Sequence, residues 1–289
     1  LYLFLLAIPL TGWIASSATG IDVMILDRWT MPAIAPVSEA WEEVFFAAHR
    51  ALTKALIGLL LVKAVITVND PVVHELMALV AQGIAMGIFF HQGQVCTASS
   101  RLLVHRSLYR RVLDELAGIA QGMRIGSGFD AATQFGPLTS KAHFARVMDF
   151  IASAKAEGAT LVAGGARVLD AGCFVQPTIF ADTTAQMRVV REEVFGPVLA
   201  VAPFDDVEDA IAAANDTPYG LAASLWTQSL SHAHRIVPRL QAGVVWVNAH
   251  NVLDAGLPLG GIKQSGTGRD LGRAAVEGFT ELKSVCMAV

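Results

Sequence analysis

The chain has 289 residues, enough for one large domain or two small ones. Its 21 Lys and Arg residues stand against 25 Asp and Glu residues, and the net charge of −4 gives no reason to expect nucleic-acid binding. Three cysteines in a chain of this length fit a reducing compartment.

The first fifth of the chain is apolar. Residues 1–21 carry no charged side chain, and a stretch of about 20 apolar residues is long enough to span a bilayer. A second apolar stretch, 55–68, is interrupted only by Lys63. Residues 27–50 between them are polar and contain Trp29 and Trp41, as expected of a loop at a membrane edge. The pattern predicts two membrane-type helices, and the start at Leu1 indicates an interior residue of something longer.

Residues 1–62 resemble the last two membrane helices of the bacterial cytochrome b561 family, through LYLFLLAIPLTGWIASSA and AHRALTKALIGLLLV. The resemblance would make His49 a ligand of haem b; the alternative for His49 is a polar residue at a helix end. A second histidine is expected fourteen residues later, where this chain has Lys63. A protonated lysine has no lone pair for iron, so the sequence argues against haem b.

Cys96 follows the uncharged run 76–90, which is either a third membrane span or a buried helix leading to this cysteine; we favour the buried helix. Small residues, 97–100, leave the thiol accessible, and a deprotonated thiol is a strong nucleophile. A lone cysteine beside apolar residues is more often a packed core thiol, so the functional interpretation depends on the segments downstream.

From residue 101 onward, helical and strand patterns alternate. This alternation predicts an α/β layered domain with a largely parallel sheet. Helices are expected at 106–123, 141–158, 207–216 and 230–243, the last weakened by Pro238, and strands at 101–105, 159–165, 198–204 and 243–249.

Three further segments do not have the pattern expected of purely structural elements: EEVFGPV (192–198), NDTPYGLAASLW (215–226) and WVNAHNVLDAGLPLGGIKQSGTGRDLG (246–272). With the cysteine run GQVCTASSRLLVH (93–105), they resemble the aldehyde dehydrogenase superfamily over about 63–289. The resemblance implies an aldehyde dehydrogenase catalytic-domain fold after residue 62. It also implies oxidation of an aldehyde to a carboxylic acid with NAD or NADP. Cys96 would form the thiohemiacetal and then the thioester.

The resemblance assigns further roles. Glu193 would hydrogen-bond the nicotinamide ribose, and Phe195 would pack beside the nicotinamide ring. The local sequence NAHNVLDAGLPLGG is similar to the branch that acts on phenylacetaldehyde and related aldehydes, so an apolar pocket is expected around Phe90, Leu253 and Leu259. The C-terminal strand, 279–289, would join the sheet of a neighbouring subunit, which implies a homo-oligomer.

The resemblance also implies missing parts. It covers about the C-terminal half of such an enzyme, so most of the cofactor domain would lie upstream. Leu59 stands where the family has its general-base glutamate. The cytochrome b561 resemblance fails at Lys63 and the aldehyde dehydrogenase resemblance at Leu59, and a fusion near 59–65 would explain both failures. We therefore expect impaired activity, a cytoplasmic dehydrogenase part, and membrane association if residues 1–62 are genuine. The alternatives are a membrane-bound b-type cytochrome-like electron-transfer protein and a non-catalytic oligomerisation partner.

Overall fold

The computed structural model describes residues 24–25, 29–30, 43, 47–48 and 71–288. The chain divides into two compact units, Leu1–Glu75 and Leu76–Val289. In the first unit, β1 (Met24–Ile25) pairs antiparallel with β2 (Trp29–Thr30). The two predicted membrane helices and His49 lie outside the described residues, so those predictions remain predictions.

The second unit contains two sheets, with β3 to β6 in one and β7 and β8 in the other. The larger has the order β3-β6-β5-β4, in which β3 and β5 pair parallel to β6 and the edge strand β4 is antiparallel. The smaller is a parallel pair, β7 with β8. The predicted parallel character is confirmed, but it is divided between two sheets. The bounds are β3 (Arg101–His105), β4 (Thr160–Ala163), β5 (Thr178–Ala181), β6 (Val198–Phe204), β7 (Ala222–Leu225) and β8 (Val244–Val247).

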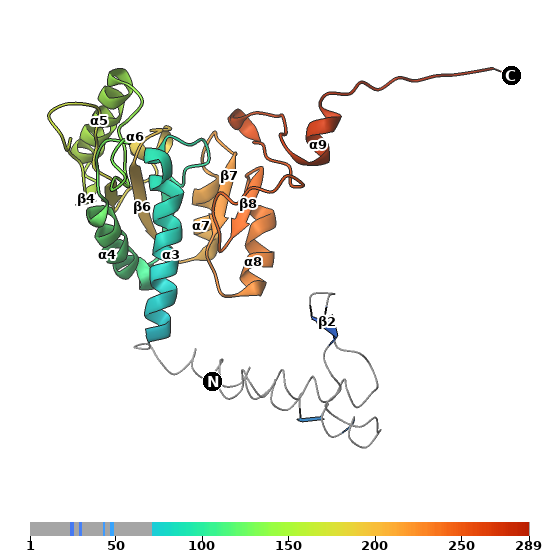
Figure 1. Cartoon of the computed structure of the whole chain (residues 1–289), viewed down its shortest axis with the longest axis horizontal. Coiled ribbons are helices and arrows are strands. Elements are labelled where there is room, and N and C mark those ends of the chain that lie inside the picture. Colours follow the sequence, from blue (N-terminus) through green and yellow to red (C-terminus); the bar gives the residue numbers. More distant parts are fainter. Residues whose placement is uncertain (1–23, 26–28, 31–42, 44–46, 49–70, 289) are drawn as a thin grey trace. The chain divides into compact units, whose positions relative to one another are not determined.

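Helices flank these sheets (Figure 1). The α-helices that lie wholly or mostly in this unit are α3 (Pro71–Phe89), α4 (Arg106–Gly122), α5 (Lys141–Ala156), α6 (Arg188–Arg191), α7 (Val207–Asn215), α8 (Leu230–Ile236) and α9 (Gly272–Glu277). Short 3-10 helices are formed by Phe90–Gly93, Val237–Arg239 and Lys263–Ser265. The predicted helix at 230–243 ends as α8 at Ile236, because Pro238 has no backbone N–H to continue the helical hydrogen bonds.

The alternation of side chains along β5 and β6 divides the core in two. Leu199 and Val201 pack with α3 and α4, whereas Val198 and Ala200 pack with α5 on the opposite face. Successive residues of a strand point to opposite faces, so a strand covered on both sides is apolar throughout. This explains the continuous run VLAVAPF, whose bounds as a strand were predicted from the sequence.

Helix α3 is a core helix, as predicted. Among the described residues, only Leu76–Gly93 is long and apolar enough to cross a membrane by length and composition. Its residues Ala81, Ile84, Ala85 and Ile88 are each at most 5% exposed and lie in the core beside the larger sheet.

The predicted strand at 279–289 does not form in this single chain. Residues 279–288 have neither helix nor strand and are exposed, and Figure 1 shows them running away from the rest of the unit after α9. Phe279, Leu282, Val285 and Met287 are all more than 70% exposed. A strand needs a neighbouring strand as its hydrogen-bonding partner, and among the described residues no strand pairs with this segment.

Candidate active site

The thiol of Cys96 lies on an exposed turn after α3. The N–H of Ala98 donates to the carbonyl of Val95 at 3.0 Å, so Cys96 and Thr97 are the two central residues of the turn. Central residues of such a turn do not use their N–H groups to close it. Within the part of the chain that the structure describes, no acceptor receives the Cys96 N–H. The turn therefore presents both a thiol and a free backbone donor.

Backbone strain precedes this turn. His91 (φ 52°) and Gln92 (φ 59°) are left-handed, as is Gly93 (φ 69°). Left-handed residues other than glycine cost about 1 kcal/mol each and persist where the surroundings hold them. The three residues reverse the chain at the end of α3 and direct it towards the 192–198 loop.

Gly93 brings the Cys96 turn against the 192–198 loop. A Cβ atom at Gly93 would lie 2.2 Å from the carbonyl oxygen of Gly196, which is far inside van der Waals contact. The backbones of two segments that are distant in the sequence can approach this closely only with glycine at this position. This contact places EEVFGPV beside the cysteine.

Helix α5 fixes the 192–198 loop through its backbone carbonyls. The ring Nε2 of His143 donates to the carbonyl of Phe195 at 2.7 Å, and Arg146 donates to the carbonyl of Glu193 at 2.8 Å. Val194 between them is 1% exposed and packs into the core. The side chains of Glu193 and Phe195 are thus left exposed on either side of a buried residue.

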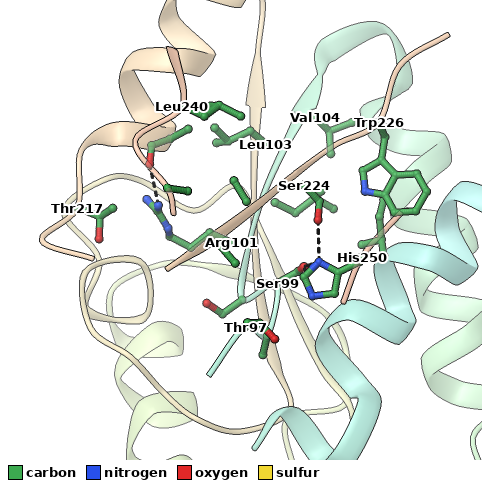
Figure 2. A pocket seen from close by; sticks show the side chains of 18 of the residues that line it. Thr97, Ser99, Arg101, Leu103, Val104, Thr217, Ser224, Trp226, Leu240 and His250 are labelled. Atoms are coloured by element: carbon green, nitrogen blue, oxygen red, sulfur yellow. Dashed lines mark hydrogen bonds between the residues drawn. The ribbon is translucent and has the colours of Figure 1, made fainter. Parts of the chain in front are cut away.

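These segments border one large cavity, of about 1470 Å³. Cys96, Glu193 and Phe195 all line it, so the structure brings together the catalytic and cofactor residues expected from the sequence. Its other walls include β3 and residues 222–224 of β7, and Figure 2 shows this part. A single small ligand usually occupies about 300–1,000 Å³, so the cavity has room for more than one.

The expected substrate-pocket residues are not gathered there. Phe90 is 49% exposed and Leu253 is 56% exposed, and neither lines the cavity. Leu259 is half-buried and pairs through its backbone with Asp270, also away from the cavity lining. The neighbouring Phe89 is instead the buried aromatic, packed edge-on against Phe135 with the ring centroids 6.5 Å apart.

Arg101 is the cation in the β3 wall of the cavity, and it is already engaged. Its guanidinium donates to the carbonyls of Ala213 and Ala214 at the C-terminal end of α7, at 3.4 and 3.0 Å. Burial lowers the pKa of Arg101, and the nearby carboxylate of Asp216 opposes that shift. The arginine therefore ties β3 to the negative end of a helix dipole and is not a free anion site.

Three residues near the cysteine were not recognised as functional in the sequence: Thr97, His250 and Asn251. Thr97 hydrogen-bonds Asn251, and the ring of His250 lies beside Ser99 and Ser224 (Figure 2). The sequence signal was weak, because these pairs are separated by 26 to 154 residues. The anchoring pair His143 and Arg146 had a clearer signal, since residues one helical turn apart share a face.

Known proteins share this sequence and fold. The model for the aldehyde dehydrogenase family matches residues 63–285. A betaine aldehyde dehydrogenase of Cereibacter sphaeroides is 48% identical over 206 residues, which are 71% of this chain and 43% of that protein. A phenylacetaldehyde dehydrogenase of Pseudomonas fluorescens is 47% identical over 210 residues, covering 72% of this chain and 42% of the relative.

A solved structure agrees with the sequence comparisons. The NAD+ complex of an aldehyde dehydrogenase from Bacillus cereus matches with a TM-score of 0.70 and 47% identity, over 71% of this chain and 42% of that one. The chain thus spans less than half the length of the relatives it matches. The match begins at Lys63, where the resemblance in the sequence also begins, and leaves residues 1–62 outside it. From Lys63 onward, this chain belongs to the aldehyde dehydrogenase family.

Proposed function

We propose that the chain carries the nucleophile and the nicotinamide-side residues of an NAD- or NADP-dependent aldehyde dehydrogenase. One observation carries the proposal: Cys96, Glu193 and Phe195, from two segments almost a hundred residues apart, line the same cavity. A thiol can attack an aldehyde, and a carboxylate and an aromatic ring that line the same cavity can hold a nicotinamide nucleotide. A core cysteine would instead be buried, whereas Cys96 is exposed.

The first chemical step follows from the turn. The Cys96 thiolate attacks the carbonyl carbon of the aldehyde, a C–S bond forms, and the carbonyl oxygen becomes an oxyanion. The Cys96 N–H, which no described acceptor uses, is placed to donate to that oxygen. One such donor is typically worth about 3 kcal/mol in the transition state.

The cofactor-side residues fit a nicotinamide nucleotide. The exposed carboxylate of Glu193 can accept hydrogen bonds from ribose hydroxyls, and the exposed ring of Phe195 offers an apolar face to a planar ring. When bound, the nucleotide would accept the hydride that leaves the thiohemiacetal. The resulting thioester is hydrolysed to the carboxylic acid and the free thiol. The resemblance in the sequence would place the family's general-base glutamate at Leu59. A leucine cannot assist this hydrolysis, and loss of a general base typically costs about 10²–10⁴ in rate.

Apolar or aromatic aldehydes are the proposed substrates, and Phe90, Leu253 and Leu259 remain the candidate pocket residues. The phenylacetaldehyde relative supports this class, although a betaine aldehyde dehydrogenase is equally similar. The apolar side chains of the 279–288 tail support a homo-oligomer in which the tail pairs with another subunit. The alternatives are a non-catalytic oligomerisation partner and, through residues 1–62, a membrane-bound cytochrome-like protein.

An activated ester tests the nucleophile without any cofactor. Mixing the purified chain with p-nitrophenyl acetate should release a burst of p-nitrophenolate equal to the concentration of active Cys96, as the thiol is acylated. Cys96→Ala should abolish the burst, and Cys286→Ala, which removes an exposed thiol in the tail, should keep it. A burst that survives Cys96→Ala would reject the proposal. With NAD+ and phenylacetaldehyde, the same chain should show little turnover, because it spans less than half the length of its relatives and has Leu59 in place of the expected glutamate.

A further inference from the structure

We propose that His250 and Asn251 are positioning residues that clamp the Cys96 turn from its C-terminal side. The proposal rests on the function proposed for Cys96. In this proposal, the loop after β8 orients the thiol and the backbone N–H of Cys96, so that both act on the same carbonyl group of the substrate.

The first link joins Asn251 to Thr97. The hydroxyl of Thr97 donates to Oδ1 of Asn251 at 3.0 Å. Thr97 is the residue directly after Cys96 and is only 6% exposed. A buried hydroxyl without its partner would be costly, so this hydrogen bond determines how the second central residue of the turn is placed.

The second link is the ring of His250. Its Nδ1 lies 3.0 Å from Oγ of Ser99 and 2.7 Å from Oγ of Ser224, and Figure 2 shows the ring between these two side chains. One imidazole thus connects Ser99, three residues after Cys96, to Ser224 of strand β7.

Helix α3 and Trp246 pack closely against this ring, which also lines the large cavity. A Cβ atom at Gly87 of α3 would lie 2.9 Å from Oγ of Ser99 and 3.1 Å from Cδ2 of His250. The N–H of Ser99 donates to the carbonyl of Gly87 at 3.0 Å. Trp246 packs edge-on against the ring, with the centroids 5.0 Å apart. Helix α3, the Cys96 turn and β8 therefore converge on His250.

The loop that carries the two residues is itself held firmly. Asn248 (φ 53°) and Asn251 (φ 55°) are left-handed. The side-chain amide of Asn248 makes two hydrogen bonds to the backbone of Thr227, both at 2.8 Å. The indole N–H of Trp246 donates to the carbonyl of Val252 at 2.8 Å. Because these hydrogen bonds restrict the motion of the loop, the loop can hold the Cys96 turn in a fixed position.

A simpler interpretation is that His250 only fills the core. Core filling would stabilise the fold without affecting the turn selectively. The clamp makes a different prediction, because two independent side chains hold the same three-residue segment, Thr97–Ser99. Their loss should change the alignment of the thiol with its N–H more than the reactivity of the thiol itself.

Two reactions of the full chain separate these interpretations. Acylation by p-nitrophenyl acetate needs the thiol and the oxyanion donor together, whereas alkylation by iodoacetamide needs only the thiol. For His250→Ala and Thr97→Val, we expect acylation to slow about tenfold or more, while alkylation of Cys96 stays within about twofold. Thr97→Ser keeps the hydroxyl and should restore acylation. His234→Ala, at an exposed histidine of α8, should change neither rate.

The remaining outcomes are also decisive. If the two rates fall together, or neither changes, the clamp is rejected. Thr97→Val is nearly isosteric, so it provides the test if His250→Ala fails to fold. If the wild-type chain is alkylated at Cys96 but gives no burst, the proposed function fails. In that case, hydrogen exchange of the backbone amides of residues 94–101 tests the clamp. Faster exchange in Thr97→Val than in Thr97→Ser supports the clamp, and equal exchange rejects it.

Discussion

The two sides of the Cys96 turn are held by different kinds of contact. On the N-terminal side, Gly93 presses against the backbone of Gly196 without any side chain. On the C-terminal side, Thr97 and Ser99 are held by the polar side chains of Asn251 and His250. A steric contact between backbones fails abruptly and is insensitive to pH. The hydrogen-bonded contact on the C-terminal side can lose one hydrogen bond while the other remains. Its strength also depends on whether His250 is protonated.

The largest effect is expected from Gly93→Ala. The added Cβ would collide with the Gly196 carbonyl, and alanine is strained at a φ of 69°. We expect the free energy of unfolding to fall by about 2–3 kcal/mol, and acylation of Cys96 to be lost as the two loops separate. Urea unfolding and the p-nitrophenolate burst measure the two effects.

Gly118→Ala is the matched control. Gly118 lies in α4, and a Cβ there would meet nothing within 4 Å. Alanine in a helix interior is favoured over glycine by about 0.5–1 kcal/mol, so this variant should be at least as stable as the wild type. Similar losses in the two variants would show that the Gly93–Gly196 approach is not the cause.

A double-mutant cycle tests the other side of the turn. Thr97→Val and Asn251→Ala each remove the same hydrogen bond, so each should cost about 1 kcal/mol of unfolding free energy. The double variant should be little worse than either, which gives a coupling energy of about 1 kcal/mol. Pairing Thr97→Val with Gly118→Ala should give no coupling. Full additivity in the first cycle would mean that the two side chains do not interact in solution.

The sequence was informative where a signal was local. The strands at 101–105 and 198–204 have the predicted bounds because their apolar runs are continuous. Cys96 could be proposed as the nucleophile only from its small neighbours together with the downstream segments that resemble the aldehyde dehydrogenases. Strand β5 was missed because its four residues lie between turn-forming residues. The His250 contacts could not be foreseen, since they join segments that meet only after the sheets have formed. For the same reason, the sequence did not show that β7 and β8 form a separate sheet.

A smaller effect is expected from Arg146→Ala, on the loop that Gly93 contacts. The variant loses the hydrogen bond to the Glu193 carbonyl and the guanidinium contact with the ring of Phe150, now 5.0 Å away. Because Arg146 is exposed, we expect a loss of only about 0.5–1 kcal/mol, with faster hydrogen exchange confined to 192–198. Arg110→Ala, at an exposed position of α4, should leave the exchange of that loop unchanged.

The smallest effect should appear in the pH dependence of stability. Burial lowers the pKa of His250 in the folded chain, and the hydrogen bond to the Thr97 backbone only partly opposes this. The unfolded state then binds more protons than the folded state as the pH falls through the unfolded value of about 6.5. Stability contributed by the neutral ring is therefore present at higher pH and lost towards acid. Urea unfolding from about pH 8 to about pH 5 measures this loss.

His250→Gln removes the titrating group while keeping a hydrogen-bonding side chain, so this part of the pH dependence should disappear. His234→Gln removes an exposed histidine and should leave the dependence as it is. The contact between Gly93 and Gly196 is made by backbone atoms alone, so the loss of stability in Gly93→Ala should not depend on the protonation of His250. If the free energy of unfolding of His250→Gln depends on pH as in the wild type, the acid sensitivity comes from other groups. The two sides of the turn would then not differ in their response to pH.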